Sequence, residues 1–269
     1  MKPFLRSALS FALLFSTLVA GPARAAEGGK GQAGQKSTAG LADEKALAAA
    51  DALYAAGQYA EAEKAARALV AARTQALGAE DKQTLVCHYH LIRALDAQHK
   101  DAEVVEACRS LLPLLIKVFG AVSRDTMSCQ TLLMEALVPQ NRDAEVVEEC
   151  RSLLPLQIKV LGPENGDILE TCGRLADALR HQEKWAEAEK EYREVLALSE
   201  RAFGAENPQT LQTCHHLALC LARQKKDKEA LTYAQRAYAG RLKVLRKDHS
   251  DTKESNVLVN ALTKPAAKV

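Results

Sequence analysis

Aromatic residues are scarce in this sequence, and runs of β-branched residues are almost missing. Phe, Trp and Tyr make up only 4% of the 269 residues, although 48% of the residues are hydrophobic. Ala, Leu, Glu, Lys and Gln are abundant instead, and these residues favour helices over strands. The composition therefore argues against a sheet-based fold, and we expect an all-α protein.

The motifs that mark catalytic or metal sites are also missing. There is no His-Glu-x-x-His and no Cys-x-x-Cys, and the glycines lie mainly in a linker and in turns rather than in a phosphate-binding loop. His88 and His90 are two residues apart, so they point to different sides of a helix. We expect no catalytic residue, no metal and no cofactor, and hence no enzyme. A Ser or Cys nucleophile beside a base remains an open alternative.

Neither sign of charge dominates the chain. The formal net charge is +2, and a nearly neutral chain argues against general nucleic-acid binding. The C-terminal end is different, because residues 223–269 hold 12 Lys and Arg against 5 Asp and Glu. This end is either a solvated Lys-rich helix surface or a surface for an acidic protein or anionic lipid.

What the sequence does contain is a repeat of 42 residues. Each copy closes on Leu or Phe followed by Gly, except that the last copy has Arg in place of Gly. These closing pairs are Leu77-Gly78, Phe119-Gly120, Leu161-Gly162, Phe203-Gly204 and Leu245-Arg246. The same step separates Gln98, Gln140, Gln182 and Gln224. A fixed period of this length indicates stacked copies of one supersecondary unit.

Each copy has the pattern of two antiparallel helices joined by a short turn. In the second copy we expect Asp101 to cap the second helix and Gly120 to end it at a positive φ. Apolar residues at helical spacing should form the inner face of that helix. These inner-face residues are Val104, Val105, Leu111, Leu112 and Ile116. The expected helix pairs span about 42–77, 82–119, 125–161, 166–203 and 208–245, followed by a capping helix at about 250–263.

Three prolines should perturb this regular array. Pro113 and Pro155 fall inside the second helices of the second and third copies, and we expect a kink at each because proline removes a helix hydrogen bond. Pro139 lies near the end of a first helix and should shorten that helix.

The seven cysteines are expected to be free thiols packed as small hydrophobic residues. Cys87 and Cys129 occupy one repeat position, and Cys108 and Cys150 occupy another. Equivalent helices of a stacked array lie about 10 Å apart, beyond the Cα separation of a disulfide. Free thiols suit a reducing compartment. The other cysteines are Cys172, Cys214 and Cys220.

The N-terminal end points to a different compartment. Residues 1–25 resemble a secretory signal peptide, with Lys2 and Arg6 before an apolar run of 13 residues and Ala23-Arg24-Ala25 at the cleavage signature. Residues 26–41 are Gly-rich and are expected to be a flexible linker. We expect an exported, periplasmic protein or one associated with a membrane. The alternative is a cytoplasmic protein whose leader is not cleaved.

Two blocks carry a resemblance to a known family. Residues 185–211, WAEAEKEYREVLALSERAFGAENPQTL, and residues 207–231, NPQTLQTCHHLALCLARQKKDKEAL, resemble tetratricopeptide repeats. The period, the closing Leu/Phe-Gly and the Pro-x-Thr-Leu opening resemble the kinesin light chain subtype over about residues 42–250. The resemblance implies a right-handed superhelical solenoid of about five helix pairs, whose concave groove, lined by the first helices, binds a protein or peptide.

The groove residues depart from the family. Kinesin light chain repeats usually carry an Asn-Asn pair in the middle of the first helix, and no Asn stands at the matching positions here. The residues expected to contact a partner are instead Tyr89, His90, Thr131, Arg174, His215 and His216. They either form a binding surface of another chemistry or face solvent without a partner.

The leader, the repeats and the basic end are together similar to bacterial kinesin light chains found beside bacterial tubulins. Two functions follow as expectations. The first is a non-enzymatic scaffold that binds a protein or peptide partner in its groove. The second is a cytoskeletal linker that binds bacterial tubulin filaments and attaches them to membrane through the leader or the basic C-terminal end. Residues 264–269 are expected to form a short tail after the repeats.

Overall fold

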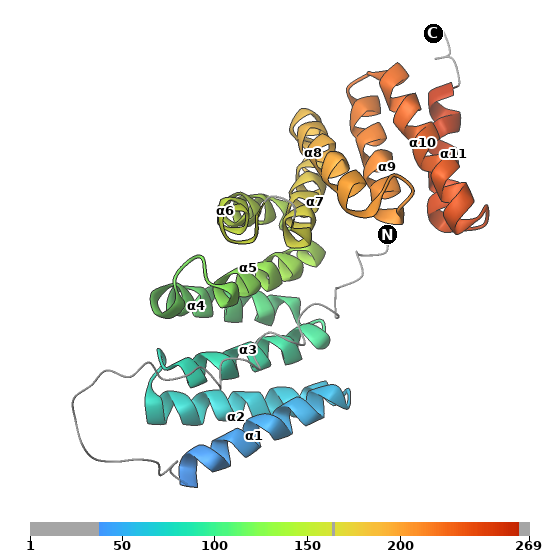
Figure 1. Ribbon diagram of the computed structural model, residues 1–269. Helices are drawn as coiled ribbons and strands as arrows, with labels where there is room; N and C mark the ends of the chain where they lie inside the picture. The colour runs from blue at the N-terminus through green and yellow to red at the C-terminus, as the bar shows by residue number, and fades with distance from the viewer. Residues whose placement is uncertain (1–37, 163–164, 264–269) are drawn as a thin grey trace. The chain divides into compact units, whose positions relative to one another are not determined.

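The computed structural model describes residues 38–162 and 165–263, and the predicted leader, most of the linker and the tail lie outside these ranges (Figure 1). Every regular element in the described ranges is helical, with eleven α-helices and one 3₁₀ helix. The all-α fold is therefore confirmed. The described part also holds no helix long and apolar enough to cross a membrane.

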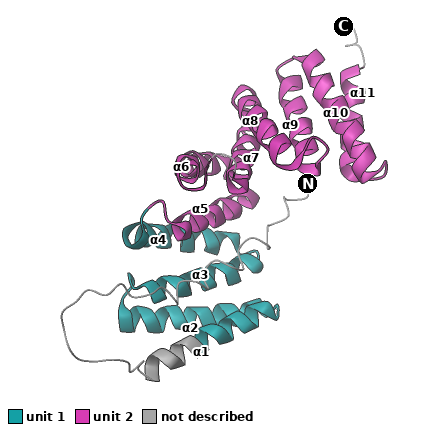
Figure 2. Cartoon of the chain, viewed as in Figure 1, with its two compact units in different colours: residues 1–120 teal, residues 121–269 magenta. Residues whose placement is uncertain are grey.

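The chain divides into two compact units, residues 1–120 and 121–269 (Figure 2). In the first unit, each helix packs against the next along the chain. Its helices are α1 (Thr38–Ala55), α2 (Tyr59–Leu77), α3 (Lys82–Ala97) and α4 (Asp101–Phe119). Helix α1 also contacts α3, so successive first helices of the pairs touch.

The second unit repeats the same arrangement. Neighbouring helices pack in sequence from α5 to α11, and α11 also contacts α9. The first of these helices are α5 (Arg124–Leu137), α6 (Asp143–Leu161), α7 (Gly166–His181) and α8 (Trp185–Phe203). They are followed by α9 (Pro208–Arg223), α10 (Asp227–Leu245) and α11 (Ser250–Thr263). The predicted helix pairs are confirmed, except that α1 begins four residues earlier and α5 one residue earlier.

The closing glycines do what the sequence predicts. Gly120 has φ 88° and ψ 157°, and its N–H donates to the carbonyl of Ile116 at 2.9 Å. This backbone region is open almost only to glycine. Arg246 occupies the equivalent position with φ 69° and ψ 169°, so the last copy of the turn is strained.

We therefore expect Arg246→Gly to stabilise the second unit. Relief of the backbone strain should raise the free energy of unfolding by about 1–2 kcal/mol. Part of this gain is offset because glycine increases the conformational entropy of the unfolded chain. Urea unfolding followed by the fluorescence of Trp185, the single tryptophan, measures the change. Lys247→Gly, one residue further in the same exposed turn, serves as the control. Equal effects of the two substitutions would contradict the strain at Arg246.

The N-cap prediction at Asp101 is wrong. Asp101 is the first helical residue of α4, and Lys100 precedes it without a side-chain cap. The reason is the tight turn, in which His99 has φ 57° and the Lys100 N–H donates to the Leu95 carbonyl at 3.1 Å. Side-chain caps occur at the first helices of the pairs instead. For example, Asp81 Oδ1 accepts from the Gln83 N–H at 2.8 Å.

The inner face of α4 is partly as predicted. Val104, Val105 and Leu111 are buried, but Ile116 is 46% exposed and Leu115 is buried in its place. Pro139 shortens α5 as expected, because that helix ends at Leu137 and a 3₁₀ turn, Val138–Gln140, follows.

Pro113 and Pro155 lie inside α4 and α6, which continue past them, and the kinks stay predictions. All seven cysteines are free and buried, as predicted. Burial raises the pKa of the Cys150 thiol to about 12, so this thiol stays protonated and unreactive near neutral pH.

Two equivalent polar clamps tie neighbouring helix pairs together, one in each unit. Glu63 on α2 accepts from Gln98 Nε2 at 2.8 Å, from Lys100 Nζ at 2.7 Å and from Arg67 Nε at 2.9 Å. Glu189 on α8 has the same set of donors, each one 126 residues further along, in Gln224, Lys226 and Arg193. A buried carboxylate with three donors holds its charge and fixes the register of the helices.

The clamp makes the stability of the first unit sensitive to acid. Burial alone would raise the pKa of Glu63, but the hydrogen bonds from Lys100, Gln98 and Arg67 lower it from 4.5 to about 2. Because the folded pKa is lowered, the contribution is complete above pH 4.5 and is lost as the pH falls toward 2. An acid titration followed by circular dichroism should show this loss, and Glu63→Gln should remove it. An unchanged titration in that variant would contradict the clamp.

Candidate binding face of the first helices

Successive first helices are joined by side chains at one repeat position. His90 Nδ1 on α3 lies 2.8 Å from Asp51 Oδ1 on α1. Arg174 Nη2 on α7 lies 2.7 Å from Glu135 Oε1 on α5. His216 Nδ1 on α9 lies 3.1 Å from Asp177 Oδ1 on α7. We call these three pairs the rungs, and the surface that carries them in each unit the first-helix face.

The rung of the first unit is surrounded by aromatic rings. The guanidinium of Arg93 lies 4.2 Å from the ring centre of Tyr54 and 5.8 Å from that of Tyr89. Tyr89, a predicted contact residue, is only 7% exposed. Burial would raise the pKa of Asp51, but His90 and Arg93 hold it below its ordinary value. Asp51 is therefore a charged anchor for both bases.

The rung between α7 and α9 belongs to a larger polar cluster. The Tyr192 hydroxyl donates to Asp177 Oδ1 at 2.5 Å, and Arg180 Nη2 lies 3.3 Å from the same oxygen. Burial would raise the pKa of Asp177, but His216, Tyr192 and Arg180 together lower it. Burial and the Asp177 charge raise the pKa of Tyr192 well above its ordinary value. The hydroxyl therefore stays a donor, and the cluster fixes how α7, α8 and α9 meet.

The middle of the face is open at Gly173. A Cβ atom placed there would meet no atom within 4 Å, although glycine inside a helix costs about 1 kcal/mol relative to alanine. Beside it, Arg174 bridges Glu135 and Glu170, at 2.7 and 2.8 Å. The Thr131 hydroxyl donates to the carbonyl of Met127 within its own helix at 3.1 Å. The first-helix face of this unit is therefore polar, with an open position at its centre.

His215 lies elsewhere than the other predicted residues. Its side chain is 7% exposed, and its Nδ1 lies 3.3 Å from Ser255 Oγ on α11. Helix α11 covers it, so His215 is not on the open part of the face. In the first unit, the rings of His90 and Tyr89 lie next to each other. In the second unit, Arg174 and His216 each contact an acidic residue of the preceding first helix.

The acidic half of each rung was not among the predicted residues. Asp51, Glu135 and Asp177 stand at one repeat position, so they recur at multiples of the 42-residue period. This acidic column was the signal that could have revealed them.

The comparisons with known proteins agree with the arrangement of paired helices. Residues 167–243 match the tetratricopeptide repeat family. The structure resembles crystal structures of nearly identical TPR-like repeats, described as a kinesin light chain from Podosopora anserina, with a TM-score of 0.62 and 23% identity over 76% of this chain and 96% of that one. Its fold is that of a tetratricopeptide repeat protein.

Two further solved structures have a fold similar to that of this chain. BtubC (BKLC) from P. vanneervenii has a TM-score of 0.57 and 16% identity, over 82% of this chain and 83% of that one. The apo form of RapI has a TM-score of 0.67 and 13% identity, over 83% of this chain and 60% of that one. At these identities the likeness concerns the fold alone. No curated protein sequence matches the chain.

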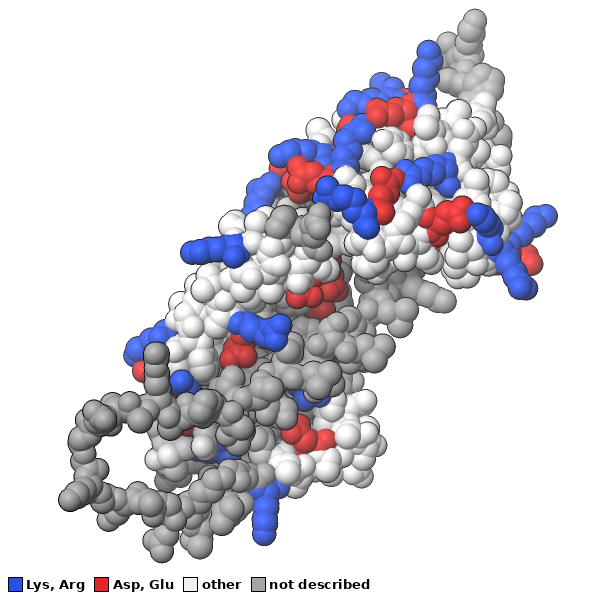
Figure 3. Space-filling view, viewed as in Figure 1, with Lys and Arg blue, Asp and Glu red and all other residues white. Residues whose placement is uncertain are grey.

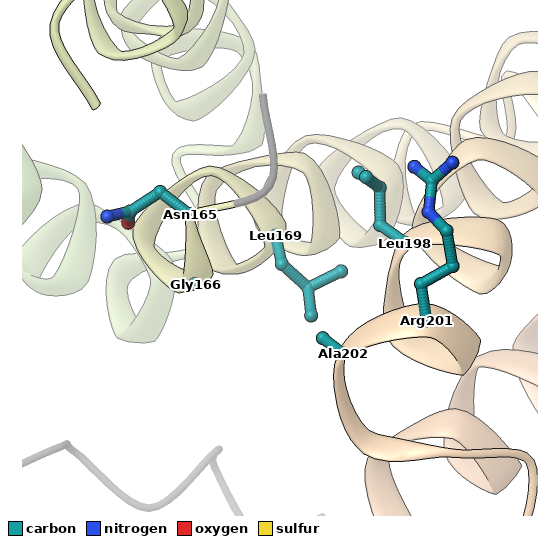
Figure 4. A pocket seen from close by; sticks show the side chains of 6 residues that line it. All are labelled: Asn165, Gly166, Leu169, Leu198, Arg201 and Ala202. Atoms are coloured by element: carbon teal, nitrogen blue, oxygen red, sulfur yellow. The ribbon is translucent and has the colours of Figure 1, made fainter. Parts of the chain in front are cut away.

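One pocket within the described ranges is small for a ligand site. A pocket between the start of α7 and the end of α8 has a volume of about 110 Å³ (Figure 4), below the roughly 300 Å³ at which ligand pockets begin. Its lining residues are Asn165, Gly166, Leu169, Leu198, Arg201 and Ala202. No group of three or more potential metal ligands occurs in the described ranges.

Neighbouring acidic residues neutralise only part of the charge on the basic C-terminal end. In Figure 3, basic side chains lie beside acidic ones on the visible face. Lys226 pairs with Glu189 at 2.7 Å, and Lys243 pairs with Glu206 at 2.5 Å. Six exposed bases of this end have no ion pair within the described ranges, namely Arg223, Lys225, Lys228, Arg246, Lys247 and Lys253.

Proposed function

We propose that the protein is a non-enzymatic scaffold that binds a protein or peptide partner along its first-helix face. The observation that supports this most is the set of rungs. Three equivalent base–acid pairs hold successive first helices side by side, and a rigid polar face of this kind can bind an extended chain without first becoming ordered. The tetratricopeptide repeat fold is used for such binding.

The binding surface that we propose in the second unit centres on Gly173. Thr131, Arg174 and His216 lie on three successive first helices, at the repeat position of Gly173 or at the next one. In the first unit, His90 stands at the repeat position of Arg174, whereas Tyr89, at that of Gly173, is buried. A partner backbone that lies along α5, α7 and α9 would pass closest to the chain at Gly173, because no side chain stands there.

The variant Gly173→Gln tests this surface by blocking it. Gln favours helix over Gly by roughly 0.5 kcal/mol or more, so the fold should become slightly more stable while a long side chain projects from the face. We expect partner recovered by affinity capture from the source cells to fall at least ten-fold. Ala197→Gln, on the exposed surface of α8, is the control and should change nothing. Unchanged capture by Gly173→Gln would contradict the proposed surface.

A second function is favoured by the likeness to BtubC (BKLC) and by the six bases that have no ion pair. In this alternative the protein links bacterial tubulin filaments to a membrane. Co-sedimentation with such filaments, and with anionic vesicles at increasing salt, distinguishes it from the first proposal. Vesicle binding should weaken as salt screens the bases. Binding that ignores salt would remove the electrostatic role of the C-terminal end.

The location of the protein is also a proposal, either export through the leader or attachment to a membrane. N-terminal sequencing of the native protein after cell fractionation tests it. A mature chain that begins near Ala26 supports export, and an intact leader in the soluble cytoplasmic fraction contradicts both forms of the proposal.

A further inference from the structure

Helix α11 is held in place differently from the first helices before it. Only two of its residues are buried, Thr252 and Ser255, and both are polar. By comparison, helix α7 buries six hydrophobic residues between Ile168 and Leu179. The apolar side chains of α11 stay partly in solvent, and Val257 in its centre is 67% exposed. Little hydrophobic burial therefore supports its docking.

A buried polar link takes the place of apolar packing. Arg241 on α10 is 3% exposed, and its Nη1 donates to the Asp251 carbonyl at 2.9 Å and to Ser255 Oγ at 2.8 Å. Ser255 Oγ in turn lies 3.3 Å from His215 Nδ1 on α9. One serine hydroxyl thus connects three helices.

This link is incompletely satisfied. Arg241 Nε and Thr252 Oγ1 are buried, and neither has a hydrogen-bond partner among the described residues. Each orphaned polar group regains water when the helix leaves, which lowers the cost of opening. The turn before α11 also contains the strained Arg246. Both features favour separation of α11 at this point of the chain.

We propose that α11 is a cap that opens from the second unit by itself as the pH falls, while α5 to α10 stay folded. Opening uncovers His215, which stands at the repeat position of Thr131 and Gly173. The open form therefore extends the polar surface of α9. The opening itself does not depend on the proposed partner binding.

The charges around His215 supply the pH dependence. Burial first, and then the charges of Arg241, His216 and Arg180, lower its pKa from 6.5 to about 3, and Asp251 opposes them only weakly. The pKa of His215 is lower in the closed form than in the open form, where it returns to about 6.5. The contribution of His215 to the closed form is therefore complete above pH 6.5 and is lost as the pH falls from 6.5 toward 3. Between pH 7.5 and 5.0, the opening constant should rise about thirty-fold through uptake of one proton.

Hydrogen–deuterium exchange of the full chain tests the cap, with peptides from α11 compared with peptides from α9. After correction for intrinsic exchange, we expect protection of α11 to fall about thirty-fold from pH 7.5 to 5.0 and protection of α9 to change little. His215→Gln should abolish the pH dependence. His216→Gln, the neighbouring histidine, should keep it.

A second variant keeps the test informative if His215→Gln does not fold. Ser255→Ala breaks the link between Arg241 and His215, so α11 should exchange at least ten-fold faster at pH 7.5 with α5 to α10 still protected. Equal protection of α11 and α9 would overturn the proposal, and so would pH dependence that survives in His215→Gln. Loss of protection throughout the second unit together would overturn it as well.

Discussion

Replacing Pro155 with alanine is expected to raise the free energy of unfolding of the second unit by about 2–3 kcal/mol. Pro155 lies inside α6, where it removes one backbone hydrogen bond and crowds the preceding turn. The side chain is exposed, so no packing is lost with it. Alanine stands at the equivalent positions 71, 197 and 239, and the helix is therefore already suited to it.

Urea unfolding followed by Trp185 fluorescence measures this gain in the unit that contains Pro155. Pro139→Ala is the matched control, because Pro139 is exposed and lies at the start of a 3₁₀ turn, where a missing N–H costs little. We expect the control to change stability by less than about 0.5 kcal/mol. A gain no larger than that of the control would mean that α6 accommodates its proline without strain.

Replacing Val147 with glutamate is expected to stabilise the second unit, although the site is 4% exposed. Val147 stands where Glu63 and Glu189 stand in the two clamps. The donors of a third clamp are already present at the equivalent positions, namely Gln182, Lys184 and Arg151. Gln182 Nε2 is moreover buried without a hydrogen-bond partner among the described residues. A carboxylate here would satisfy it, with an expected gain of about 1–2 kcal/mol.

Val146→Glu is the control for this prediction. Val146 is fully buried on the neighbouring side of the helix, away from the clamp position, so a carboxylate there should cost at least about 3 kcal/mol. The same urea titration distinguishes the two variants. If Val147→Glu were as damaging as Val146→Glu, the repeat would not carry a latent clamp at this position.

The helix boundaries could be predicted because the repeat shows the same turn five times. Each Leu/Phe-Gly pair ends a helix, and a position such as Gly120 needs a backbone conformation that other residues seldom adopt. The errors at Asp101 and Ile116 have local causes. Asp101 is not the N-cap because the turn before α4 is closed by backbone hydrogen bonds and Lys100 takes the cap position. Leu115 is buried instead of Ile116 because the helix is rotated by about one residue from the predicted phase.

The candidate site was only half accessible from sequence. His90, Arg174 and His216 were predicted from their place in the first helices, but their partners lie 39 residues earlier on another helix. Which side chains of two stacked helices meet depends on their packing. The burial of His215 beneath α11 could not be predicted either. Helix α11 docks through Arg241 and Ser255 rather than through an apolar stripe, which the sequence would have shown.

Photo-crosslinking from the first-helix face tests the central claim most directly. A photoreactive amino acid at Thr131 would stand on α5, and one at Gln212, which occupies the repeat position of Glu170, would stand on α9. One at Ala197 would stand on the exposed surface of α8. If partners bind along the first helices, irradiation in the source cells links the same partner from Thr131 and from Gln212 but not from Ala197. Crosslinks that form from Ala197 alone would contradict the account.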